Sequence, residues 1–590
     1  MVKYKNWVFT ILVILFLIFS FYPTIFEISK KDKLADTRRE FILEHNYYWP
    51  DYNLYLSKIR QGIQGQFTAV EKYTSEIHQG SLIQEFYVVL GWLGKILNLD
   101  PNSSYLFGRI ILAPFLLIII FLLVRYYFHS FMWQIMAFLI TVVSGSFPRI
   151  FTDPQGINHI GRFMEWWSNI DALQRITFIP HILFAQIVSF YLLYHLAIKQ
   201  LNNVTMKQLI IYILLGNIVG LTFPPSLITL DSILILLLLI NIIKNKKQFI
   251  GLLGYCLPAQ AGVIGLFVLL TLPSLLYIFI TTHHLPWSAL IEFHRTHPMM
   301  IPFDQYILGT GPIFFLGLAG AIISIIKRDK KFQPLIFWIL ATFGFATFFS
   351  VIKDQSPLRF TQTGLFIPLG LLGSYFFYQL WKYITANIAA GDAREGSQPK
   401  MYRSVGILER QDPQIQIKEI SLAAFIIILS FYILGSLFIM KTSLDWQLDW
   451  IGQRVQAFNP DVPYPPQSMY PIREWMDGIR WLKNNTKSDD VVLAEITAAN
   501  HIPAYSGNIV YWGQSNTVDY DRKEKEVDKF FSGKMSENEA QLFLKNGRIK
   551  YIFFSVQEKE KAGGKNLDYY YQFILPAFHN NVTNIYAFRN

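Results

Sequence analysis

The chain of 590 residues has only one cysteine, Cys256, and it lies inside an apolar run. One cysteine excludes an internal disulfide and a metal centre built from several thiolates. Charged residues are also scarce, at 16% of the chain. No Gly-rich phosphate fingerprint follows a predicted strand, and no metal motif of fixed spacing, such as an EF-hand loop, occurs. These absences argue against a nucleotide cofactor and against a thiolate metal centre.

A long basic tract is missing as well, although the formal net charge is +11. Much of the basic excess forms short clusters between apolar runs, which is typical of loops anchored at a membrane surface. The charge therefore does not indicate a nucleic-acid partner, and we expect the bilayer itself to be the partner of these clusters.

Hydrophobic sequence is abundant, with 52% hydrophobic residues, 16% aromatic residues and a mean hydropathy of +0.30. A hydrocarbon core of about 30 Å is crossed by about 20 apolar residues in a helix. The pattern predicts a polytopic α-helical membrane protein with about eleven transmembrane helices. The runs lie near 7–26, 105–128, 131–147, 176–197, 208–223, 225–243, 252–281, 306–326, 333–351, 360–381 and 420–440.

The lysine and arginine bias of the short loops predicts a cytoplasmic N-terminus, because alternate loops on that side carry far more cations. The first span reads as an uncleaved anchor rather than a signal peptide. An odd number of spans then places the first long loop (27–104) and the C-terminal segment outside a cell membrane crossed many times. The polar segment 382–419 is expected to be a flexible cytoplasmic loop.

The first outer loop contains HNYYWPDYNLYLSKIRQG, in which Asp51 precedes Tyr55 by one helical turn. A carboxylate just above a bilayer, beside aromatic and basic residues, suits a general base. The alternative is that Asp51 only caps a short helix, since Pro50-Asp51 is a good helix start. Glu76 and His78 of the same loop are further candidates for the site, against the alternative of solvated loop charges.

Three other outer loops supply candidates. In the loop 148–175, acidic residues such as Asp153 are possible oxygen ligands for a divalent cation, which is left open as a cofactor. Arg175 and Arg359 each stand where a span begins and can bind a lipid phosphate, or else serve as ordinary interface anchors. The third outer loop has four histidines without a third ligand at defined spacing for zinc, so we interpret them as neutral loop residues.

The composition changes after the last span. We expect residues 1–440 to form the membrane domain and 441–590 to form a soluble, extracytoplasmic α/β domain. Short β-rich runs alternate there with helical stretches, a pattern that predicts a mostly parallel, doubly wound sheet. A surface helix is expected in EFYVVLGWLGKIL, where apolar residues repeat at helical spacing.

The arrangement resembles the GT-C superfamily of polyprenyl-phosphate-sugar-dependent glycosyltransferases, which includes protein O-mannosyltransferases and aminoarabinose transferases. The resemblance covers most of the chain and rests on four features. They are the early long loop with Asp51, the surface helix after it, the segment SPLRFTQTGLFIP around Arg359, and the terminal domain with WLKNNTKSDDVVLAE and IPAYSGNIVYWG.

The resemblance implies inverting transfer of a sugar from a polyprenyl-phosphate donor to a glycan, lipid or protein acceptor on the outer face. Asp51 takes the position of the general base, and Arg359 holds the leaving phosphate, with Arg175 as a second candidate. Many members have a second acid directly after the first, whereas Tyr52 follows here, which puts a carboxylate pair and its metal in doubt.

Two other functions fit part of the pattern. An O-antigen polymerase or ligase uses related donors, but its large outer loop usually comes late in the chain. A lipid-linked-glycan transporter or flippase predicts paired internal repeats and broken spans with polar residues at mid-bilayer, and no such repeat is visible in the sequence.

Overall fold

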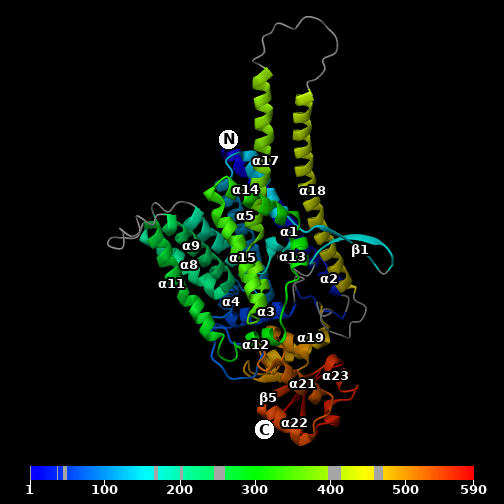
Figure 1. The fold of residues 1–590 in the computed structure, drawn as a ribbon. Helices are drawn as coiled ribbons and strands as arrows, with labels where there is room; N and C mark the ends of the chain where they lie inside the picture. Colours follow the sequence, from blue (N-terminus) through cyan, green and yellow to red (C-terminus); the bar gives the residue numbers. More distant parts are fainter. Residues whose placement is uncertain are drawn as a thin grey trace, which may run out of the picture.

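The computed structural model of this protein describes residues 2–35, 38–43, 49–153, 155–164, 170–198, 204–244, 259–395, 413–456 and 470–589. A bundle of apolar helices forms the larger part, and an α/β domain closes one end of it (Figure 1). The N-terminus lies at the opposite end of the bundle from this domain.

Every predicted span contains a helix. Six described helices are long and apolar enough to cross a membrane, and a seventh span results if α13 and α14, which are bent by 85°, count together. Multiple membrane crossings are thus confirmed, while the number eleven stays a prediction. The helices of these runs are α1 (Val2–Ile28), α5 (Pro101–Tyr127), α6 (Phe131–Val143), α7 (Pro180–Leu193), α8 (Met206–Thr222), α9 (Pro224–Lys244), α11 (Ala259–Thr281), α13 (Phe303–Thr310), α14 (Pro312–Ile326), α15 (Gln333–Val351), α17 (Phe366–Glu395) and α18 (Pro413–Val455).

The polar segment 382–419 differs in part from the expected flexible loop. Helix α17 continues to Glu395 and α18 begins at Pro413, so the described residues of the segment are helical, and 396–412 lie outside the described residues. The start of the run 252–281 also lies outside them, as far as residue 258. Helix α18 runs past residue 440 to Val455, and the next described helix, α19, begins at Arg473.

The outer segments form short elements between the spans. They are α2 (Lys31–Ala35), α3 (Trp49–Ile63), α4 (Glu85–Ile96), the strands β1 (Pro148–Thr152) and β2 (Asn158–Arg162), η1 (Gln174–Thr177), α12 (Ala289–Thr296) and α16 (Leu358–Thr361). The predicted surface helix is α4. One face buries Tyr87 and Leu90, while Ile96 on the other is 79% exposed. The antiparallel β1–β2 hairpin was not anticipated from the sequence.

Helices α3 and α4 cross at two glycines. A Cβ atom on Gly62 would lie 2.0 Å from the carbonyl oxygen of Val88, and one on Gly91 would lie 2.1 Å from that of Ile59. Any side chain at either position would therefore clash with backbone, so only glycine permits this approach. The close crossing fixes α3, whose first turn carries Asp51, against the surface helix α4.

The C-terminal domain contains a five-stranded sheet of order β4-β3-β5-β7-β6. Strands β4, β3 and β5 are parallel, whereas β7 and β6 are antiparallel to their neighbours. The predicted α/β class is confirmed, but the sheet is mixed, because a short turn joins β6 to β7. The elements are α19 (Arg473–Asn485), β3 (Val491–Leu493), α20 (Ile496–Tyr505), β4 (Ile509–Val510), α21 (Tyr520–Phe531), α22 (Glu537–Asn546), β5 (Ile549–Phe554), α23 (Val556–Lys561), β6 (Leu575–His579) and β7 (Asn584–Ala587).

The first outer loop and the C-terminal domain share one hydrophobic core. Leu54 and Tyr73 of the loop belong to the same buried cluster as Val492 and Ile502 of the domain. The backbone N–H of Val510 also donates to the carbonyl oxygen of Lys72 at 2.9 Å, where the loop runs along β4. The domain is therefore packed onto the loop that carries Asp51.

Candidate active site

Asp51 lies in the first turn of α3, where the helix dipole favours negative charge. Its Oδ1 accepts a hydrogen bond from Gln514 Nε2 at 3.4 Å. Burial raises the pKa of Asp51 to about 6, and the positive charge of Arg359 opposes that rise. A carboxylate with this pKa is ionised near neutral pH and still takes up a proton readily, as a general base must.

Arg359 lies in α16, directly before the span that begins with α17. Its Nη1 donates to Gln355 Oε1 at 3.1 Å. The guanidinium acts through space on Asp51, and burial lowers the pKa of Arg359 from its usual value. The structure thus brings together a carboxylate from the first outer loop and a guanidinium from the fourth.

Tyr55 lies one turn after Asp51 and joins a stack of tyrosine rings. Its ring centroid is 4.4 Å from that of Tyr87 and 6.4 Å from that of Tyr105. Burial and the negative charge of Asp51 hold the pKa of Tyr55 well above its usual range, so its hydroxyl stays neutral. The Tyr87 hydroxyl meets His181 Nδ1 at 2.7 Å. These rings form a rigid aromatic wall beside the two charged groups.

His294 of α12 is a site residue that sequence reasoning did not single out. Its side chain is buried, and neither ring nitrogen has a hydrogen-bond partner among the residues that the structure describes. Burial and the nearby charge of Arg359 lower the pKa of His294 to about 4. The imidazole is therefore neutral, with one donor and one acceptor nitrogen available beside Arg359. The cluster of histidines in the third outer loop was the only signal in the sequence.

Gln514 was also missed, and it comes from the C-terminal domain. It follows the segment IPAYSGNIVYWG directly. The loop around it is held in place because Thr517 Oγ1 donates to the carbonyl oxygen of Tyr73 at 2.7 Å and accepts from the N–H of Gly513 at 3.3 Å. The domain thus supplies a polar side chain directly to Asp51.

Glu76 and His78 bind other parts of the protein. Glu76 Oε1 pairs with Lys523 of α21 at 2.7 Å, and His78 Nε2 accepts the N–H of Glu71 at 2.9 Å. His78 therefore holds the first outer loop in shape, and Glu76 ties this loop to the C-terminal domain. Their role in substrate binding stays a prediction.

The same loop contains a fully buried ion pair between Lys58 and Glu71, at 3.2 Å. Replacing Glu71 with glutamine leaves the Lys58 ammonium without a compensating charge, so we expect a loss of about 3–5 kcal/mol of stability. Thermal unfolding in detergent measures this. The matched control is Asp445→Asn, which breaks the exposed Lys441–Asp445 pair on α18 and should change stability by no more than about 1 kcal/mol. The prediction would be contradicted if both variants had the same melting temperature as the wild type.

Arg175 and Asp153 lie elsewhere. Arg175 Nη2 donates to the carbonyl oxygen of Val142 at 2.7 Å, and its guanidinium covers the ring of Phe366 at 4.2 Å. Asp153 follows β1 in the hairpin, which projects from the side of the bundle (Figure 1), and its Oδ2 meets His159 Nε2 at 2.7 Å. Within the described residues neither is hydrogen-bonded or ion-paired to Asp51 or Arg359.

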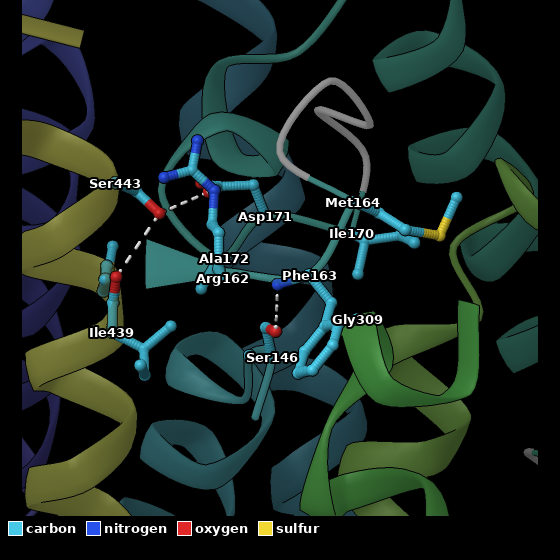
Figure 2. Close-up of a pocket in the computed structure, with 12 residues that line it drawn as sticks. Ser146, Arg162, Phe163, Met164, Ile170, Asp171, Ala172, Gly309, Ile439 and Ser443 are labelled. Atoms are coloured by element: carbon cyan, nitrogen blue, oxygen red, sulfur yellow. Dashed lines mark hydrogen bonds and ion pairs between the residues drawn. The ribbon is translucent and has the colours of Figure 1, made fainter. Parts of the chain in front are cut away.

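Figure 2 shows a separate small cavity between the hairpin segment and α18. Arg162 Nε lies 2.8 Å from Asp171 Oδ2, and Ser443 Oγ donates to the same carboxylate. Both charges are buried and neutralise each other, so this cluster joins α18 to the outer loop rather than offering a free charge to a ligand.

No group of three or more histidine, cysteine, aspartate or glutamate side chains is arranged to hold a metal ion among the described residues. Tyr52, which directly follows Asp51, donates its hydroxyl to the carbonyl oxygen of Leu43 at 2.6 Å. The divalent cation that the sequence analysis left open for the loop 148–175 stays untested.

The Asp51→Asn variant should have a higher melting temperature than the wild type at pH 7.5. The unfolded carboxyl loses its proton near pH 4, whereas the folded one keeps it up to about pH 6. The free energy of unfolding of the wild type therefore falls as the pH rises from about 4 to about 6. The variant does not lose this stability, because asparagine has no proton to release in this range. Thermal unfolding between pH 4 and pH 8 tests this: the two curves should meet near pH 4, diverge up to about pH 6 and stay apart by a constant amount above it. A constant separation across the range would contradict it.

Two solved structures have a similar fold. ArnT from Cupriavidus metallidurans bound to undecaprenyl phosphate aligns over 99% of this chain and 98% of its own, with a TM-score of 0.50 and 12% identity. The Archaeoglobus fulgidus oligosaccharyltransferase tethered to an acceptor peptide aligns over 98% of this chain and 74% of its own, with a TM-score of 0.51 and 12% identity. No protein-family model and no curated protein sequence matches the chain. The chain therefore has the GT-C fold, as the resemblance predicted.

Proposed function

We propose that this protein is a membrane glycosyltransferase that moves a sugar from a polyprenyl-phosphate donor to a glycan, lipid or protein acceptor, with inversion. The observation that carries the proposal is the convergence of Asp51 and Arg359 in a GT-C fold. Burial places the pKa of Asp51 at about 6, and the Arg359 guanidinium lies close enough to oppose that shift. A base and an anion-binding cation are the two groups that such a transfer requires.

In the proposed reaction, the acceptor hydroxyl gives its proton to the Asp51 carboxylate while its oxygen attacks the anomeric carbon. The bond from that carbon to the phosphate oxygen breaks on the opposite face, and the bonding electrons leave with the polyprenyl phosphate. The configuration of the sugar is thereby inverted. Arg359 binds the phosphate oxygens and stabilises the charge that develops on them.

Other residues have supporting roles in this proposal. Tyr55 and its stacked neighbours form the wall of the site, and Glu76 and His78 shape the acceptor side through the loop they hold. Arg175 stays a second candidate for the lipid phosphate, and Asp153 a candidate for contact with the substrate at the outer surface. The bilayer dissolves the donor's tail, so no nucleotide has to be bound.

The orientation is part of the proposal. The N-terminus faces the cytoplasm, and the C-terminal domain with Asp51 faces the extracytoplasmic side of the cell membrane. The loop charges support this, as does the position of the N-terminus and the domain at opposite ends of the bundle (Figure 1).

Transfer of a labelled sugar from its polyprenyl phosphate by the purified, reconstituted chain tests the function. We expect labelled product together with free polyprenyl phosphate in equal amounts. A panel of hexosyl and pentosyl donors, offered with glycan, lipid and peptide acceptors, identifies both substrates. Movement of the donor across liposomes without any transfer would contradict the proposal and favour a flippase.

A further inference from the structure

His294 of α12 is a buried polar group to which the proposed reaction assigns no role. Only 7% of the residue is exposed, and neither ring nitrogen has a hydrogen-bond partner among the described residues. Burying a donor and an acceptor without partners costs free energy, so native proteins rarely keep such groups unless something else pairs with them. A ligand that reaches this ring can supply both missing partners.

The segment around α12 contacts both the loop that carries the active-site guanidinium and the C-terminal domain. Ser356 Oγ donates to Met299 Sδ at 4.0 Å, which joins the third outer loop to the fourth. The ring centroids of Phe293 and Tyr520 are 5.3 Å apart, which joins α12 to α21 of the domain. These contacts flank His294 along the chain and hold its ring in the buried position.

The ring of His294 adjoins the guanidinium of the site rather than its carboxylate. Burial and the charge of Arg359 lower the pKa of His294, whereas the pKa of Tyr55 responds to burial and then to both Asp51 and Arg359. Arg359 is the group proposed to bind the phosphate of the donor. A side chain beside it is therefore placed to meet this phosphate and the sugar attached directly to it.

The hydrogen-bonding capacity of the ring selects what it can bind. A neutral imidazole has one donor nitrogen and one acceptor nitrogen. The ionised phosphate of a polyprenyl-phosphate sugar can only accept hydrogen bonds, and the isoprenoid tail forms none. The hydroxyls of the sugar both donate and accept. Within the donor, they alone can supply the hydrogen that the acceptor nitrogen of His294 requires.

We propose that His294 selects the donor by its sugar: one ring nitrogen donates to a phosphate oxygen beside Arg359, and the other accepts a hydrogen bond from a hydroxyl of the transferred sugar. The inference rests on the proposed function and narrows its donors to sugars that carry a hydroxyl at the position facing His294. The ring exchanges no proton in the reaction. A donor without this hydroxyl leaves the acceptor nitrogen unpaired in a buried site, which should weaken binding by about 10–100-fold.

Binding of undecaprenyl-phosphate sugars to the full chain in detergent micelles, measured without an acceptor, tests the inference. The parent is the hexosyl or pentosyl donor that binds most tightly. It is compared with its monodeoxy analogues and with undecaprenyl methyl phosphate, which has the same charge and no sugar. We expect undecaprenyl methyl phosphate and one monodeoxy analogue to bind the wild type at least about 10-fold more weakly than the parent. In His294→Phe this analogue and the parent should bind equally, because the apolar ring cannot accept the hydrogen bond.

Further variants control for the substitution itself. His284→Phe makes the same change at an exposed position of the same loop and should discriminate between the donors like the wild type. His294→Gln keeps a donor and an acceptor and should retain part of the discrimination. Melting temperatures are measured for all variants, and His294→Leu replaces His294→Phe if the larger ring lowers stability.

Equal affinity of the wild type for the parent and for every monodeoxy analogue would overturn the inference. The same loss of affinity for the deoxy donor in the wild type and in the apolar variant would overturn it as well. Both results leave the proposed function standing if labelled sugar is still transferred. Discrimination in binding without transfer of any sugar would instead contradict the proposed function, while supporting the contact between His294 and the sugar.

Discussion

Asp51→Asn is expected to lower kcat for sugar transfer by about 10²–10⁴-fold, the usual contribution of a positioned general base. Asparagine has the shape of aspartate and can still meet Gln514, but it cannot take the proton of the acceptor hydroxyl. The KM for the lipid donor should change little, because Arg359 still binds the phosphate. Initial rates at saturating donor, with the melting temperature as a check of folding, measure the effect.

The pH profile of the wild type separates a base from a merely structural carboxylate. Because the pKa of Asp51 is about 6, kcat/KM should be level above this pH and fall about tenfold per pH unit below it. The control is Asp445→Asn, which changes an exposed carboxylate on α18. Its rate should match the wild type. Transfer at the wild-type rate by Asp51→Asn would remove Asp51 as the base.

Arg359→Gln is expected to lower kcat by about 10²–10³-fold, because the charge that forms on the leaving phosphate loses its preorganised partner. Arg359→Lys should recover only part of the rate, since an ammonium cannot bind two phosphate oxygens in the fork geometry of a guanidinium. Steady-state rates with varied donor separate the loss in kcat from any loss in binding.

A second readout links Arg359 to Asp51 directly. The Arg359 charge lowers the pKa of Asp51, so its removal should shift the acidic limb of the pH profile to higher pH. The control is Arg295→Gln, which removes an exposed guanidinium paired with Asp354, and it should leave both the rate and the limb unchanged. An unshifted limb in Arg359→Gln would show that the two side chains do not act on one site.

The site also explains why the C-terminal domain is packed onto the first outer loop. Gln514 reaches Asp51 from the domain, and Thr517 binds the backbone of Tyr73. Asp51 is buried in part by a domain that follows the last span, and this burial is the main cause of its raised pKa. The raised pKa of Asp51 therefore depends on the domain remaining docked.

Features with a local physical cause could be predicted from the sequence. Apolar runs marked every helical span because a bilayer requires them. The helical spacing of apolar residues predicted α4, and short continuous apolar runs predicted the strands of the sheet in the C-terminal domain. The position of Asp51 at a helix start and that of Arg359 at the head of a span were visible for the same reason.

Contacts between distant segments were decided only by the tertiary structure. Gln514 and Asp51 are 463 positions apart, and no periodicity or spacing relates them. The raised pKa of Asp51, the burial of His294 and the pairing of Lys58 with Glu71 likewise arise from packing between elements. Sequence patterns report what one segment prefers by itself, whereas burial and charge at a site depend on which segments meet there.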